Sequence, residues 1–282
     1  MVDKKKNWLD KKMDAMRKRA KKDRSYKKRM VILWAILLTI WAGAVFFLAQ
    51  FIVFGITQWL IIDTLNFDLN LIVAQTVCMA VSNILALVIV IFVSRKIFKQ
   101  VVNRDSLGLK GWPTWTDILL SPIGYIVSTI VAALILAIMQ QAVPGIDWNQ
   151  AQDVGFNSLY TQSDKIVTFV ALVIVAPITE ELLFRGFLYG RLRSRMSAVP
   201  AIILVSILFG LLHGQWNVAI VVGVMSVFMC IARELTGTIY AGILMHMLRN
   251  GIAYYFLYIN PIVGGGVGLA VAPVLLPFLA II

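Results

Sequence analysis

Eight apolar segments of membrane-spanning length occupy most of this 282-residue chain, and no other feature restricts its fold as strongly. A helix needs about 20 apolar residues to cross a hydrocarbon core about 30 Å thick. The segments lie at approximately 30–54, 71–94, 117–139, 166–190, 199–213, 217–233, 236–258 and 262–282. The sequence therefore predicts an all-α fold, a polytopic membrane helix bundle with about eight transmembrane helices. The fifth and sixth segments are short, so we expect one of them to be tilted, broken or re-entrant.

Charged residues between the segments indicate how the bundle is oriented. Residues 1–29 contain fourteen Lys or Arg and four Asp, which gives +10 of the total formal charge of +12. The connections at 95–110 and 191–195 are also basic, whereas those at 63–70 and 140–165 are acidic on balance. Because basic connections stay in the cytoplasm, we expect both ends of a multi-pass protein of the plasma membrane to lie inside the cell.

The chain divides into a basic cytoplasmic tail, residues 1–29, and one membrane domain, residues 30–282. Within the tail, Leu9, Met13, Met16 and Ala20 recur at helical spacing among basic residues. This pattern predicts an amphipathic helix on the anionic headgroups of membrane lipids, and a solvated tail that only sets the orientation is the alternative. Nucleic acid is not an expected partner, because no aromatic interleaving accompanies the basic residues.

Ionisable residues inside the apolar segments point to a functional site. The chain has only three glutamates and two histidines, and Glu180, Glu181, His213 and His246 all fall in or at the ends of apolar segments, as does Arg185. A charged residue at the bilayer centre costs about 2.5–3.5 kcal/mol, so such residues face one another or a water-filled cavity. At about 1.5 Å per residue, Glu180, His213 and His246 lie about 15–21 Å from the predicted helix ends. We therefore expect them to converge.

Their spacing suggests separate tasks. Glu181 and Arg185 are four residues apart on one helical face, so Arg185 can hold Glu181 ionised and oriented. Glu180 points about 100° away from Glu181 and can face a different neighbour. His246 and Asn250 are also four residues apart and can address one ligand together.

Activation of water against a carbonyl group is the chemistry that fits these residues. A glutamate removed from water is a stronger base, and Glu180 could accept a proton from a water that His213 positions. His246 and Asn250 could then donate hydrogen bonds to the oxyanion of a tetrahedral intermediate. The chain contains neither a Gly-x-Ser-x-Gly nucleophile elbow nor a His-Glu-x-x-His zinc motif.

The residues of the expected site occur in three ordered stretches: Glu180-Glu181-Leu182-Leu183-Phe184-Arg185-Gly186, Phe209-Gly210-Leu211-Leu212-His213 and His246-Met247-Leu248-Arg249-Asn250. Together they resemble the three motifs of the CAAX protease and bacteriocin-processing family of intramembrane endopeptidases, also called the Abi family. The resemblance covers a family core at about 166–258. It implies hydrolysis of a peptide or protein substrate near the cytoplasmic half of the membrane, with Glu180 and His213 activating water and His246 and Asn250 binding the oxyanion. Glu181 and Arg185 match the rest of the first motif.

Two points stay open beside that resemblance. Members of the family have been described both as zinc-dependent and as metal-independent glutamate proteases. Because the chain has no pair of histidines at i, i+4, we expect no metal and no other cofactor, with a His₂Glu zinc site as the alternative. Two other functions compete with proteolysis: a proton-coupled transporter or channel, which would favour discontinuous helices in repeats that the sequence lacks, and a non-catalytic membrane protein of bacteriocin immunity or binding.

Overall fold

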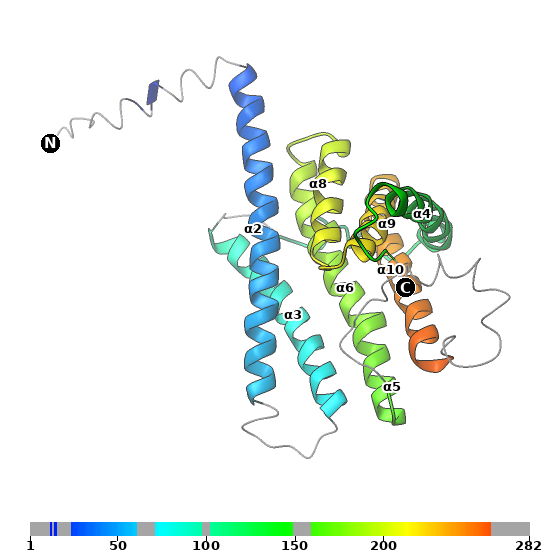
Figure 1. Ribbon diagram of the computed structural model, residues 1–282. Coiled ribbons are helices and arrows are strands. Elements are labelled where there is room, and N and C mark those ends of the chain that lie inside the picture. Colours follow the sequence, from blue (N-terminus) through cyan, green and yellow to red (C-terminus); the bar gives the residue numbers. More distant parts are fainter. Residues whose placement is uncertain are drawn as a thin grey trace.

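The computed structural model describes residues 24–60, 71–97, 102–148 and 159–260, with the isolated positions 12, 14 and 15. Every regular element in these ranges is a helix, which confirms the predicted all-α membrane fold (Figure 1). The predicted eighth helix at 262–282 and most of the basic tail lie outside the described residues.

The helices follow one another in this order: α2 (Arg24–Gln58), α3 (Leu71–Ile97), α4 (Trp115–Ala142), α5 (Gln162–Phe169), η2 (Val170–Val175), α6 (Ala176–Glu181), η3 (Leu182–Tyr189), α7 (Gly190–Arg193), α8 (Ala198–Leu211), α9 (Trp216–Thr236), α10 (Tyr240–Tyr254) and η4 (Tyr255–Ile259). The elements named η are π-helical turns. Elements α5 to α7 form one uninterrupted helix over Gln162–Arg193.

Five helices among the described residues are long and apolar enough to cross a membrane: Tyr26–Ile56, Ile72–Lys96, Trp115–Ala142, Gln162–Arg193 and Trp216–Thr236. Helix α8 is apolar but has only 14 residues, about 21 Å, so by itself it is too short for a hydrocarbon core of about 30 Å. Helix α9 is longer than the sequence predicted, with 21 residues. Its last turn contains Arg233 and Glu234. Because both residues are polar, the hydropathy pattern predicted that the helix would end too early.

The helix that carries the first motif owes its local form to its sequence. It begins with a capping box in which the Thr161 hydroxyl accepts a hydrogen bond from the Asp164 amide and the Asp164 carboxylate accepts one from the Thr161 amide. Pro177, which has no N–H to donate, sits in the first turn of α6, immediately after the π-helical turn η2. The two glutamates therefore occupy a short α-helical stretch between two π-helical ones, an arrangement that is frequent at functional sites.

This helix lies in the centre of the bundle. Helix α2 pairs with α3 on one side of it, while α9 packs against α8 and α4, and α10 against α4 (Figure 1). The largest buried apolar cluster joins Leu183, Phe184 and Leu188 to side chains of α2, α3, α8 and α9. The Phe184 ring makes edge contacts with Phe46 of α2 and Phe209 of α8, with centroids 5.7 and 5.0 Å apart. The centre of the bundle is thus fixed by aromatic packing around the first motif.

Three connections meet at one end of the bundle. The guanidinium of Arg233 donates to the Leu107 carbonyl at 3.2 Å, the Tyr240 hydroxyl donates to the Gly111 carbonyl at 2.9 Å, and Arg193 forms an ion pair with Glu234 at 2.9 Å. These contacts join the loop before α4, the end of α7 and the end of α9. The loop and the end of α7 include the basic connections that charge placed in the cytoplasm.

Glycine at position 210 is expected to be required for the contact between α8 and α9. A Cβ atom there would lie 2.5 Å from the Ala219 carbonyl oxygen, which is backbone and cannot rotate away. Gly210→Ala should lower the free energy of unfolding by about 1–3 kcal/mol, measured by denaturation of the detergent-solubilised protein. Gly55→Ala, where nothing lies within 4 Å, is the matched control and should not destabilise. Equal effects of the two substitutions would contradict the close contact.

Candidate active site

The two adjacent glutamates occupy different environments. Glu181 is fully buried and forms an ion pair with Arg185, also fully buried, with 2.6 Å between Oε1 and Nη1. The Glu180 side chain is 18% exposed and lines a cavity of about 520 Å³. The predicted divergence of the two side chains is therefore present, with one carboxylate in the protein interior and the other in contact with the cavity.

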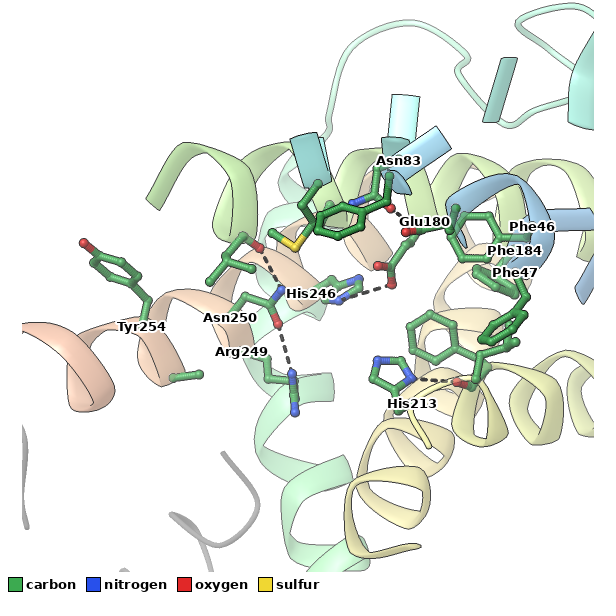
Figure 2. Close-up of a pocket in the computed structure, with 18 of the residues that line it drawn as sticks. Phe46, Phe47, Asn83, Glu180, Phe184, His213, His246, Arg249, Asn250 and Tyr254 are labelled. Carbon is green, nitrogen blue, oxygen red and sulfur yellow. Dashed lines mark hydrogen bonds and ion pairs between the residues drawn. The ribbon is translucent and has the colours of Figure 1, made fainter. Parts of the chain in front are cut away.

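His246 of α10 lies between both carboxylates, and Figure 2 shows it beside that of Glu180. Its Nδ1 is 3.3 Å from Glu181 Oε1, and its Nε2 is 4.0 Å from Glu180 Oε2. A proton on Nδ1 donated to Glu181 fixes the ring and turns Nε2 toward Glu180. Gly242 permits this approach of α10, because a Cβ atom there would lie 2.7 Å from Glu181 Oε2.

His213 follows α8 and reaches the same cavity. Its Nδ1 lies 2.8 Å from the Phe209 carbonyl oxygen, so a proton on Nδ1 can be donated there, which leaves Nε2 as an acceptor. The Phe209 ring contacts both imidazoles, with centroids 5.0 Å from His213 and 5.8 Å from His246. The Arg185 guanidinium stacks on the same ring, 4.3 Å from its centroid. Phe209 thus lies between the buried ion pair and His213, and its ring packs against Arg185, His213 and His246.

Asn250 also lines the cavity, but it has more partners than the sequence suggested. Its Nδ2 donates to the Leu172 carbonyl at 2.8 Å, and its Oδ1 accepts from Arg249 Nη1 at 3.0 Å (Figure 2). These two contacts fix the orientation of the amide. One N–H of the side-chain amide is committed to Leu172, so the second is the one that can serve a ligand.

The structure brings the six predicted residues into one region. Glu180, His213, His246 and Asn250 line the cavity, and Glu181 with Arg185 lies directly behind them. Sequence reasoning missed three polar residues of the same cavity wall: Gln50, Asn83 and Arg249. Gln50 of α2 donates a hydrogen bond to Asn83 of α3. Each of the three is a polar residue within an apolar helix, so the criterion that found the glutamates could also have found them.

A metal site needs at least three converging donors. In the ranges that the structure covers, no three His, Cys, Asp or Glu side chains are grouped closely enough to hold an ion. Chelation of the active protein, described below, is the test of the zinc alternative.

The site is a set of carboxylates and imidazoles around a cavity inside an all-helical bundle, and comparison with known proteins shows what the chain is similar to. Residues 162–252 match the family described as Type II CAAX prenyl endopeptidase Rce1-like. The chain is 24% identical over 192 residues to a Bacillus subtilis protein named "Putative membrane peptidase YdiL", covering 65% of this chain and 72% of the relative. No solved structure matches the chain.

Both matches support an intramembrane protease of the CAAX protease and bacteriocin-processing family. The matched residues begin at α5 and end in α10, so they contain all six residues of the predicted site. The sequence had predicted a family core at about 166–258.

Breaking the buried ion pair should be more harmful than removing both partners. Arg185→Met leaves a buried carboxylate without its counter-ion, which should lower the free energy of unfolding by about 3–5 kcal/mol. The double variant Glu181→Met/Arg185→Met should lose less than Arg185→Met alone, because no uncompensated charge remains. Chemical denaturation in detergent measures all of these values.

Arg95→Met is the control, since Arg95 is exposed in the last turn of α3. If the double variant loses as much as Arg185→Met and the single variant Glu181→Met together, Glu181 and Arg185 do not act as a pair.

Proposed function

We propose that this intramembrane endopeptidase hydrolyses a peptide bond with a water activated by Glu180 and His213, near the cytoplasmic half of the plasma membrane. The observation that carries the proposal is the convergence of Glu180, His213 and His246 on one cavity, with Glu181 and Arg185 behind His246. A cavity of about 520 Å³ has room for a short segment of peptide together with the water.

In the proposed reaction, Glu180 accepts a proton from water while the water oxygen forms a bond to the carbonyl carbon of the substrate. His213 Nε2 accepts the other hydrogen of the same water and so aims its lone pair. The tetrahedral intermediate then loses its C–N bond, and Glu180 returns the proton to the departing amine. A carboxylate in contact with the cavity, but largely out of solvent, is suited to this exchange.

The oxyanion of the intermediate would be stabilised by His246 and Asn250. The contact of Nδ1 with Glu181 holds the His246 ring so that Nε2 is on the side of the cavity, and in the proposed reaction an Nε2–H donates to the oxyanion. The second amide N–H of Asn250 is the other donor. Arg185 contributes indirectly, because it holds the Glu181 carboxylate in position.

The same proposal includes the expected absence of a cofactor and the nature of the partners. Side chains supply every step above, so we expect catalysis without a metal. Peptide or protein segments are the proposed substrates, and prenylated C-terminal peptides are the first class to test, given the family that the chain matches. Membrane lipids, including anionic headgroups at the basic tail, are proposed as further partners.

Glu180→Gln should abolish most of the activity, because an amide cannot accept the proton of water. We expect kcat to fall about 10²–10⁴-fold, measured by cleavage of a quenched peptide library that includes prenylated peptides. His213→Ala should also lower kcat. Asp105→Asn removes an exposed carboxylate outside the cavity and should keep wild-type activity.

Adding a chelator to the same assay tests whether catalysis requires a metal ion. Activity that survives prolonged chelation supports the metal-free reaction, whereas loss that zinc restores would make Glu180 and the histidines metal ligands. If the wild-type protein cuts nothing beyond the Glu180→Gln background, while bacteriocin immunity persists in that variant, the non-catalytic function is favoured instead.

Asn250→Ala should slow the chemical step more than it weakens binding. Loss of one oxyanion donor is expected to reduce kcat about 10²–10³-fold, with KM changed only a few-fold, as measured by steady-state kinetics on the best peptide. A raised KM at constant kcat would show that Asn250 binds the ground state only, and a normal kcat would limit it to joining α10 to Leu172.

A further inference from the structure

A second hollow lies at the opposite end of the motif-bearing helix from α5, where α7 and the end of α9 meet. It has a volume of about 390 Å³ and is lined by Ser106, Tyr189, Gly190, Arg191, Arg193, Ser194, Arg233, Glu234 and Gly237. Three arginines and one glutamate give this wall a net charge of +2. We name it the arginine pocket. None of the six predicted site residues belongs to it.

The guanidinium groups of the arginine pocket are held in place by other contacts. Arg193 donates through Nε to Glu234 at 2.9 Å and through Nη1 to the Met196 carbonyl at 3.1 Å. Arg233 donates through Nη1 and Nη2 to the carbonyls of Leu107 and Ser106, at 3.2 and 3.4 Å. A guanidinium has five N–H donors, so each of these two arginines keeps donors for a ligand.

The backbone around Arg233 is shaped to receive its side chain. Gly108 has a φ of +75°, and a Cβ atom there would overlap Arg233 Nη1. A Cβ at Gly190 would lie 3.2 Å from the Ser106 carbonyl oxygen and 3.4 Å from Arg233 Nη2. Arg191 lies over the Phe187 ring, 5.8 Å from its centroid. Arg193 and Arg233 are thus held in place before any ligand arrives, which reduces the entropic cost of binding.

The position of the arginine pocket matches the level of lipid headgroups. It lies where the apolar span Gln162–Arg193 ends and beside the C-terminal turn of α9. The loop before α4 forms its third side, and this is a connection that the distribution of basic residues places in the cytoplasm. Basic pockets between transmembrane helices on this side of a membrane are suited to phosphate-bearing headgroups.

We propose that the arginine pocket binds a phosphate group, either of an anionic phospholipid or of a soluble phosphate. Guanidinium groups form paired, charge-assisted hydrogen bonds with phosphate oxygens. A monoanionic or dianionic phosphate offsets the net +2 of the wall. The volume exceeds that of a phosphate alone, so a glycerol headgroup can enter with it. Glu234 opposes binding, because its carboxylate competes for Arg193.

The experiment uses the full-length protein in neutral detergent and follows the thermal unfolding midpoint as each probe is added. The probes are phosphatidylglycerol, phosphatidylcholine and inorganic phosphate. We expect phosphatidylglycerol to raise the midpoint, and Arg191→Gln/Arg233→Gln to increase the half-saturating concentration at least tenfold. Arg95→Gln replaces an exposed arginine outside the pocket and should change the half-saturating concentration less than twofold.

A second variant, which should strengthen binding, tests the proposal even if the loss of Arg233 prevents folding. Glu234→Gln removes the only carboxylate of the arginine pocket, so it should lower the half-saturating concentration several-fold. Because the basic tail is common to all variants, its own affinity for lipid cancels in the comparison.

The probes distinguish the two sources of phosphate. A response to phosphatidylglycerol alone assigns a lipid headgroup, and an equal response to inorganic phosphate assigns a soluble ligand. The proposal is overturned if no probe shifts the midpoint, or if the pocket variants respond as Arg95→Gln does.

Discussion

The buried contact among Glu181, Arg185 and His246 is the interaction on which the rest of the bundle depends. Lipid cannot solvate a carboxylate or a guanidinium, so each must find its partner within the protein. Arg185 supplies the counter-charge from the same helix, and His246 brings α10 against it. Gly242 keeps the backbone of α10 close enough, and Phe209 brings α8 over the guanidinium. Satisfying one buried ion pair therefore sets the positions of three helices.

Local helix geometry then gives two adjacent glutamates different surroundings. Consecutive side chains on a helix diverge by about 100°, which lets Glu181 enter the interior while Glu180 meets the cavity. The π-helical turns on both sides of α6 change the rotation of the side chains before and after this pair. Pro177 is compatible with that change because it has no N–H to donate. Thus the sequence Pro177 to Glu181 gives the two glutamates different directions, and the packing of α2, α8 and α10 gives those directions different surroundings.

The sequence predicted the helical membrane fold and the set of residues that converge, because both follow from the cost of placing polar groups in lipid. It could not predict which atoms would meet. The contact between Asn250 and the Leu172 carbonyl depends on how closely η2 approaches α10, and hydropathy contains no such information. The length of α9 was also underestimated, since Arg233 and Glu234 are helical but polar. Gln50, Asn83 and Arg249 were open to the same argument that singled out the glutamates, yet Gln50 and Asn83 are uncharged and therefore gave a weaker signal.

The presence of Arg249 in the cavity wall is explained by charge balance within the membrane. Glu181 and Arg185 neutralise each other, which leaves Glu180 as an acidic group in the wall of the cavity. Arg249 lies in that same wall and is only 6% exposed. With it, the two glutamates and the two arginines of the region sum to zero, which limits the cost of burying them. The same residue orients the Asn250 amide. Arg249 therefore both compensates the charge of Glu180 and orients the Asn250 amide. This explains why an arginine lies next to Asn250 in a mostly apolar helix.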